Sequence, residues 1–285
     1  MGGVRRLGSP ALRVRRLLIY LGWTVLLMPV QALGLALRRQ WTTRLPRFYH
    51  RSCCRILGLK VRRIGRPTQA RPVLFAANHI SYLDITVLGS LLAVSFIAKR
   101  EVARWPLFGW LARLQRSVFI DRQVRSTREQ RDSIAGRLAG NEALVLFAEG
   151  TSGDGNRILP FKSALFSVAD SKALDRPDDE IAVQPVSIAY TRLDGMPIGR
   201  RLRPLFAWYG SMSLAPHLWT VLGLGTVEVV VEFHPPTTLA QCGSRKALAR
   251  YCEERVATGM ASALSGRRRP PQDRRLGNAA ATAAG

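Results

Sequence analysis

The segment 78–84, NHISYLD, holds a histidine and an aspartate five residues apart, directly after the apolar run PVLFAA at 72–77. An imidazole titrates near neutral pH and can take a proton from a substrate. It works as a base only in one tautomer, and a carboxylate that accepts a hydrogen bond from the other ring nitrogen fixes that tautomer. A lone histidine after a strand is more often structural, but a helix that begins near Ser81 would bring Asp84 back to His79. The spacing therefore indicates a base, His79, that is oriented by Asp84.

A second polar loop, FAEGTSGDGNRILPFKSA at 147–164, also follows an apolar run, ALVLF at 143–147. Its glycines allow tight turns and close approach of a ligand to the backbone. Glu149 and Lys162 add charge near the end of the preceding run. Taken alone, the loop is explained equally well as an ordinary connection between a strand and a helix.

Short apolar runs alternate with helical stretches along the chain, which is typical of an α/β fold. We predict a mixed central sheet flanked by helices, with functional loops at the carboxyl ends of the strands. The run 227–233 alternates apolar and acidic residues, which indicates a half-exposed strand near a sheet edge, and 60–72 is expected to be a loop. The expected strands are 73–77, 95–100, 117–120, 143–147, 181–189 and 227–233, and the expected helices are 85–94, 126–138 and 245–264.

The segment 17–37 contains 21 residues without a charge. As a helix it would be about 31 Å long, close to the bilayer core of about 30 Å. Arginines flank it on both sides and Pro29 interrupts it, so a bent or shallow insertion is as compatible as a full span, and a buried helix of a soluble protein is a further alternative. Residues 41–59 mix arginines with aromatic and apolar residues, which predicts a basic amphipathic helix at the membrane interface, broken at Pro46.

The composition points to an anionic partner, because the chain has 43 Lys and Arg residues but only 19 Asp and Glu residues, which gives a net charge of +24. The arginines concentrate around the apolar N-terminus and no nucleic-acid-binding motif is present, so we expect an anionic membrane surface and no nucleic acid. The four cysteines form no CxxC pair or metal-ligand pattern, and Cys53 and Cys54 are expected to pack in a reduced, cytosol-facing protein. The expected organisation is a membrane-associated segment 1–59, a catalytic domain 60–265 and a disordered basic tail 266–285.

Four short motifs occur together in one order. NHISYLD at 78–84 is followed by FIDR at 119–122, by FAEGT at 147–151 with PFK at 160–162, and by VQPVSI at 183–188. This set resembles the glycerolipid acyltransferase family, which includes the bacterial 1-acylglycerol-3-phosphate acyltransferases. The resemblance covers about residues 72 to 190 and implies a glycerol-3-phosphate acyltransferase-like α/β domain with a membrane-inserted N-terminal helix.

The resemblance implies transfer of a fatty acyl chain from acyl-acyl carrier protein or acyl-CoA to the free hydroxyl of a lysolipid, at the cytoplasmic face of the cell inner membrane. His79, held by Asp84, would deprotonate that hydroxyl, with no covalent enzyme intermediate, no metal and no cofactor. Asn78 would also shape its loop. The residues that the resemblance assigns to substrate binding are Asn78, Arg122, Glu149, Gly150, Thr151 and Lys162.

The third motif departs from the family pattern, because Ser152 stands where an arginine that grips the acceptor phosphate is expected. An arginine–phosphate contact contributes about 10- to 100-fold in affinity, which serine cannot supply. Lysophosphatidate is the family default acceptor. The missing arginine and the aromatic segment 206–219 also fit the branch that acylates lyso-ornithine lipid. Thioester hydrolysis and a non-catalytic membrane scaffold are the remaining alternatives.

Overall fold

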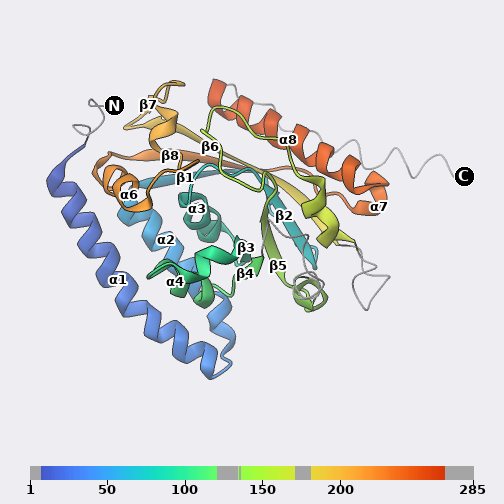
Figure 1. The fold of residues 1–285 in the computed structure, drawn as a ribbon, viewed down its shortest axis with the longest axis horizontal. Helices are drawn as coiled ribbons and strands as arrows, with labels where there is room; N and C mark the ends of the chain where they lie inside the picture. Colours follow the sequence, from blue (N-terminus) through green and yellow to red (C-terminus); the bar gives the residue numbers. More distant parts are fainter. Residues whose placement is uncertain (1–7, 121–133, 135, 171–180, 267–285) are drawn as a thin grey trace, which may run out of the picture.

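The computed structural model describes residues 8–120, 134, 136–170 and 181–266, whose strands form one mixed sheet (Figure 1). The strand order is β1-β8-β6-β2-β5-β3-β4, and β7 pairs with β6. All neighbouring pairs are parallel except β6 with β8 and β6 with β7. The bounds are β1 Leu59–Ile64, β2 Val73–Ala77, β3 Ser95–Lys99, β4 Val118–Ile120, β5 Ala143–Phe147, β6 Ala182–Leu193, β7 Met196–Pro197 and β8 Val227–Phe233.

Helices cover both faces of this sheet (Figure 1). α8 packs along β6 on one face, while α2 and α3 pack together on the other, and α1 runs past α2 and α6. This arrangement confirms the predicted α/β fold. The bounds are α1 Pro10–Ala36, α2 Leu45–Leu57, α3 Leu83–Leu91, α4 Phe108–Leu114, α6 Leu214–Gly223, α7 Leu239–Cys242 and α8 Arg245–Ser265.

The two central strands are buried on both sides, which explains why they are apolar throughout. Successive residues of β2 enter different cores: Phe75 packs with α2 and α3, whereas Leu74 packs with α8. β5 divides in the same way, with Val145 in the first core and Leu144 in the second. The sheet therefore holds the carboxyl ends of β2 and β5 rigidly side by side, in the register that pairs Ala77 with Phe147.

Several expected elements are confirmed. β2 and β5 have the predicted bounds, and α8 begins at the predicted residue. β8 lies next to the edge strand β1, as expected for a strand near a sheet edge, but it is less exposed than predicted, because five of its residues are buried and Glu228 and Glu232 are intermediate. α3 begins at Leu83, two residues before the predicted helix, and most of the expected helix 126–138 lies outside the described residues.

The expected loop 60–72 is wrong in its first part, because β1 occupies Leu59–Ile64 and pairs with β8. Only Leu59 of this edge strand is buried. Its other positions are largely basic and face solvent, so the strand carries no alternating apolar pattern that sequence reasoning could detect.

The buried residues of α1 are polar or small, whereas most of its large apolar residues are exposed. Arg16, Thr24, Gln31 and Gly34 are its buried residues. Pro29 lies inside the helix, which continues past it to Ala36. By length and composition this is a helix that could cross a membrane. The exposed large apolar residues of this region are Val14, Leu18, Ile19, Leu21, Val25, Leu26, Val30, Leu33 and Leu37.

α2 begins next to Pro46, as the expected break at that proline implies. Most of its apolar face is not free to meet a membrane, because α3 covers it and Cys53, Cys54 and Leu57 are buried there, whereas Phe48 is exposed. The two cysteines are unbridged, as predicted. The basic face of α2 remains outward, so the amphipathic pattern reflects packing in the core.

Candidate active site

His79 and Asp84 meet in the turn between β2 and α3. Nδ1 of His79 lies 2.9 Å from Oδ2 of Asp84. The same oxygen accepts the backbone N–H groups of Ile80 at 2.7 Å and Ser81 at 2.9 Å. Asp84 is fully buried in the first turn of α3. The start of this helix therefore places the carboxylate where it can accept from the backbone of the turn that carries His79. The structure brings together the pair that the sequence predicted.

The second oxygen of Asp84 also has a partner. Oδ1 accepts a 2.8 Å hydrogen bond from the hydroxyl of Tyr190, which lies on β6 beside β2. Burial, reinforced by the negative charge of Asp84, raises the pKa of the Tyr190 phenol well above its ordinary value, so it remains a donor. Sequence reasoning missed Tyr190 because the predicted strand ended at Ala189, one residue before it.

This hydrogen bonding decides which nitrogen of His79 is available. With Nδ1 engaged by Asp84, the neutral ring carries its lone pair on Nε2. The ring stacks on Phe147, the last residue of β5, with 3.9 Å between centroids and an interplanar angle of 19°. Its side chain keeps 15% of its surface exposed and borders a cavity. The arrangement can take a proton from a group in that cavity and return it.

Glu149 connects the two predicted loops. Its Oε1 accepts the backbone N–H of His79 at 2.7 Å, and its Oε2 accepts that of Leu159 at 2.8 Å. The residue is 2% exposed, and burial raises the pKa of its carboxyl group to about 7. A further bond runs from the N–H of Gly153 to the carbonyl of His79. Glu149 therefore joins the His79 loop to its own loop through buried hydrogen bonds, and it is not among the residues that line the cavity.

The other residues assigned to substrate binding occupy different surroundings. Thr151 is exposed and lines the cavity with the neighbouring Ser152. Asn78 is buried, and its side-chain amide pairs with both backbone groups of Ile188 on β6, at 3.0 and 2.8 Å. The amide thus joins the end of β2 to β6 and fixes where the loop begins.

Gly150 turns the chain at φ +73°, and a Cβ there would lie 3.0 Å from Cδ of Lys162. The close approach and the positive φ explain the glycine. Lys162 is exposed and lies outside the cavity lining, as does Arg157, the other cation that could have replaced the missing arginine. Arg122 lies outside the described residues.

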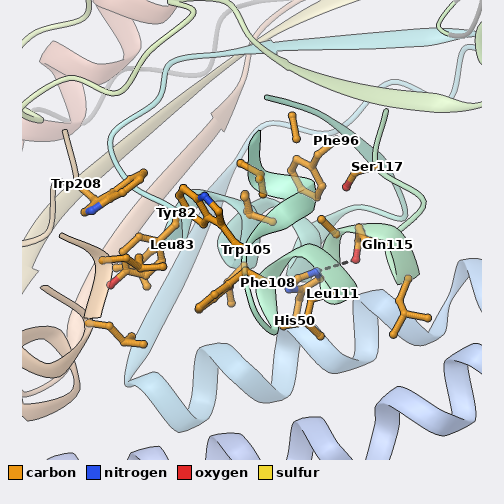
Figure 2. A pocket seen from close by; sticks show the side chains of 18 of the residues that line it. His50, Tyr82, Leu83, Phe96, Trp105, Phe108, Leu111, Gln115, Ser117 and Trp208 are labelled. Atoms are coloured by element: carbon orange, nitrogen blue, oxygen red, sulfur yellow. Dashed lines mark hydrogen bonds between the residues drawn. The ribbon is translucent and has the colours of Figure 1, made fainter. Parts of the chain in front are cut away.

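A cavity of about 520 Å³ opens beside His79. Figure 2 shows side chains from its wall, among them Tyr82, Phe96 and Leu111. The cavity extends between α1, α2, α3 and α4 and reaches α6, and sequence reasoning missed it because these helices meet only in the tertiary structure. Its wall is mostly apolar, with His50 and Gln115 hydrogen bonded at 2.9 Å within it. Representative lining residues from the four helices are Leu17, Tyr20, Met28, Tyr49, Leu83, Ile85, Leu111 and Ala112.

The three remaining histidines all have partners. His50 bonds to Gln115, His217 lies 3.0 Å from the hydroxyl of Tyr82, and His234 lies 3.1 Å from the hydroxyl of Ser187. His234 is buried under the sheet, whereas Tyr82 borders the cavity. Among the residues that the structure describes, no group of three or more His, Cys, Asp or Glu side chains is placed to hold a metal ion.

Comparison with known proteins identifies the family. The lyso-ornithine lipid O-acyltransferase of Brucella abortus (strain 2308) is 48% identical over 245 residues, which cover 86% of this chain and 92% of the relative. The chain belongs to the Acyltransferase family. That family matches residues 59–189, the part that carries the His79 and Glu149 loops. The family expected from the four motifs is thereby confirmed, and the protein is an acyltransferase.

A second relative has the same name as the Brucella protein. The lyso-ornithine lipid O-acyltransferase of Rhizobium meliloti (strain 1021) is 45% identical over 250 residues, covering 86% of this chain and 85% of the relative. A crystal structure of the 1-acyl-sn-glycerophosphate acyltransferase PlsC from Thermotoga maritima superposes with a TM-score of 0.62 at 22% identity, over 91% of this chain and 100% of that one. It shares the fold, which confirms the predicted class.

Proposed function

We propose that this acyltransferase moves a fatty acyl chain from an acyl thioester to the free hydroxyl of lyso-ornithine lipid. The observation that carries the proposal is the placement of His79, whose Nδ1 is held by Asp84 while its ring borders an apolar cavity. The names of two relatives at 48% and 45% identity support the acceptor. Ser152 in the cavity lining supports it too, because serine provides no cation for a phosphate.

In the proposed reaction, Nε2 of His79 takes the proton of the acceptor hydroxyl as its oxygen attacks the carbonyl carbon of the thioester. The C–O ester bond forms, the C–S bond breaks, and the proton passes from Nε2 to the leaving thiolate. Asp84 holds the imidazole in the required tautomer and stabilises the imidazolium that forms. General base assistance of this kind contributes about 10²- to 10⁴-fold to the rate.

The apolar cavity would hold an acyl chain during the transfer. Burying each methylene contributes about 0.8 kcal/mol, so a long chain gains most of its affinity from such a wall. The thioester is carried by acyl carrier protein or by CoA, and offering both donors in the assay distinguishes them.

We further propose that α1 attaches the enzyme to the cytoplasmic face of the inner membrane. Its exposed side is apolar, whereas its buried side carries Arg16, Thr24 and Gln31 against the domain. A helix that packs along the domain in this way suits entry into one leaflet better than a free span. The net charge of +24 would add attraction to anionic lipids.

The test is an acyl-transfer assay with purified protein in mixed micelles. Labelled acyl-acyl carrier protein and acyl-CoA are each offered with lyso-ornithine lipid or with lysophosphatidate. We expect label in ornithine lipid, and a loss of about 10²- to 10⁴-fold in His79→Ala. The matched control is Arg250→Ala on the exposed side of α8, which should retain full activity.

The outcomes separate the alternatives. Label only in phosphatidate would reject the proposed acceptor and retain the reaction. Label released as free fatty acid without either lysolipid would identify a thioester hydrolase. Transfer that persists in His79→Ala at the wild-type rate would reject the proposed base.

A further inference from the structure

The cavity beside His79 has one positive and one negative side chain at its edge. Among its lining residues, Lys99 is the one basic side chain other than histidine, and Glu101 is the one acidic side chain. Both are exposed, and within the described residues neither takes part in an ion pair. The lining therefore carries one charge of each sign, and neither is neutralised by an ion pair within the described residues.

The sheet places these two charges on the side where the reaction is proposed. β3 ends at Lys99, and Glu101 follows in the 3-10 turn Arg100–Arg104. β3 is parallel to β5, which in turn is parallel to β2, so all three strands end on the same edge of the sheet. Ligands of open α/β sheets bind outside this edge, and His79 follows β2 there.

Aromatic rings line the same cavity. Trp105 and Trp208 meet edge to face, with 5.6 Å between centroids and an angle of 89°. Tyr82 contacts Trp208 at 6.1 Å and 69°. Figure 2 shows the three rings close together along one side of the cavity.

Two of these rings are tied to the residues already described. Trp105 ends the 3-10 turn that carries Glu101. The backbone N–H of Trp208 donates a 2.9 Å bond to the carbonyl of Ile80, the residue after His79. Both indoles are half-buried, so each keeps part of its surface open. Aromatic faces attract ammonium groups, and most strongly when the partner is tryptophan.

We propose that Lys99, Glu101 and the indoles of Trp105 and Trp208 form the head-group site of the acceptor and select a zwitterion. The Glu101 carboxylate and the indole faces take the acceptor's ammonium, and the Lys99 ammonium takes its carboxylate. This inference rests on the proposed function. Once its α-amino group is acylated, ornithine retains one ammonium and one carboxylate, which is the charge pattern of the lining.

The same pattern explains discrimination against a phosphate acceptor. A phosphate monoester carries a charge of about −1.5 to −2 at neutral pH. Within the described lining, Lys99 alone would attract the phosphate. Glu101 would repel it, and Ser152 carries no positive charge. Selectivity then comes from an added repulsive group as well as from an attractive one.

The experiment measures KM and kcat for lyso-ornithine lipid and for an analogue whose side-chain ammonium is acetylated to a neutral amide. Wild type should lose about 5- to 30-fold in kcat/KM on the analogue, because the charge-assisted contact is removed. Glu101→Gln should lose a similar factor on the natural acceptor, mainly in KM. The variant should then show little further loss on the analogue, because the pair contributes only when both partners are present.

Two further variants complete the test. Trp105→Leu should also weaken the natural acceptor more than the analogue, which separates loss of an ammonium contact from a folding defect. Lys99→Met should raise KM for both, because the carboxylate is present in each. Glu254→Gln, which removes an exposed carboxylate from α8, is the matched control and should leave KM unchanged.

Two results would overturn the inference. In the first, both Glu101→Gln and Lys99→Met keep the wild-type KM for the natural acceptor. In the second, Glu101→Gln and Trp105→Leu lose the same factor in kcat/KM on the natural acceptor and on the analogue. Failure of the proposed function is visible separately, since wild-type enzyme would then make no ornithine lipid at all.

Discussion

The hydroxyl of Tyr190 donates a 2.8 Å hydrogen bond to Oδ1 of Asp84, across 106 residues of sequence. Together with the backbone N–H groups of Ile80 and Ser81 and the ring of His79, it gives the buried carboxylate four donors. A carboxylate that is fully hydrogen bonded keeps its charge and its orientation without solvent. Tyr190 is therefore a positioning residue for the proposed base, and it acts through Asp84.

Tyr190→Phe should lower kcat by about 10-fold, because a hydrogen bond to a charged group is worth about 1.5–3 kcal/mol. Without this donor the carboxylate binds the imidazolium more strongly, so the acid limb of the pH–activity profile should move to higher pH. Steady-state kinetics across pH, with KM for both substrates, provides the measurement.

Tyr251→Phe on α8 is the matched control, since it removes a phenol whose hydrogen bond within the described residues goes to the carbonyl of Pro235, at 3.4 Å. An unchanged kcat and an unchanged profile in Tyr190→Phe would show that Asp84 orients the histidine without help from β6.

Glu149→Gln tests whether Glu149 braces the loops or binds substrate. The two oxygens of Glu149 each accept one backbone N–H, whereas glutamine offers one oxygen and turns an NH₂ group toward the other donor. One buried N–H then loses its partner, at a cost of about 1–3 kcal/mol. We expect a lower free energy of unfolding and a lower kcat with KM nearly unchanged. A raised KM at wild-type stability would instead support the substrate contact expected from the sequence.

Burial makes the stability contribution of Glu149 depend on pH. The pKa of its carboxyl group is raised from 4.5 to about 7 in the folded protein, so this contribution is complete below pH 4.5 and is lost as pH rises through 7. The stability deficit of Glu149→Gln relative to wild type should therefore be larger at pH 4.5 than at pH 7.5. Chemical denaturation at both pH values measures it.

His50 contributes with the opposite sign. Burial lowers the pKa of its imidazole from 6.5 to about 4, so its contribution is complete above pH 6.5 and is lost as pH falls through 4. His50→Gln keeps a donor for Gln115 and removes the titration. Relative to wild type, the variant should gain about 3 kcal/mol as pH falls from 6.5 to 4, since one pKa unit is worth 1.36 kcal/mol. A constant difference across this range would show that His50 gains access to water when it is protonated.

The sequence was sufficient for the parts of the site that lie within one loop. His79 and Asp84 are five residues apart and bond directly, and the strands before the two loops are short, apolar and buried on both faces. The contact from Tyr190 depends on β6 lying beside β2, which no local pattern specifies. The hydrogen bonds of Glu149 similarly need two loops to meet, so the sequence offered only the contact with substrate that the family resemblance implies.

The cavity was beyond prediction for a related reason. Its walls come largely from α1, α2, α3, α4 and α6, and the N-terminal helix was interpreted from its apolar surface alone. The polar residues of α1 had no role in that interpretation, yet Gln31 lines the cavity and donates to the carbonyls of Thr42 and Leu114. A few polar residues in an apolar helix thus determine which side packs on the protein.

Ala112→Phe tests whether the cavity holds the acyl chain. Ala112 lies on α4 and lines the cavity, so a phenyl ring there should exclude part of a long chain. We expect a preference for shorter acyl thioesters, with a loss of about 4-fold for each methylene that no longer fits. Mass spectrometry of products from a mixture of chain lengths measures the shift. Ala261→Phe adds the same ring at an exposed position of α8 and should keep the wild-type profile; identical profiles in both variants would place the chain elsewhere.

We expect Arg16 to hold α1 against the rest of the domain. Its guanidinium donates to the carbonyls of Leu222, Leu224 and Gly225 at the end of α6, at 3.3, 2.5 and 3.2 Å. Arg16→Lys keeps the charge and loses the planar set of donors, so those carbonyls lose partners. We expect faster chymotryptic cleavage near Tyr20 and Trp23, with Arg15→Lys, an exposed neighbour, as the control.

Loosening α1 should also affect catalysis, because Leu17, Tyr20 and Met28 form part of the cavity wall. KM for the acyl thioester should rise in Arg16→Lys while the enzyme still sediments with membranes, since the apolar outer face of α1 is unchanged. Loss of membrane binding at wild-type KM would show the reverse, that Arg16 serves attachment and the wall forms without it. The two readouts therefore separate the two sides of this helix, the one that packs on the domain and closes the cavity and the exposed apolar one that is proposed to meet the lipid.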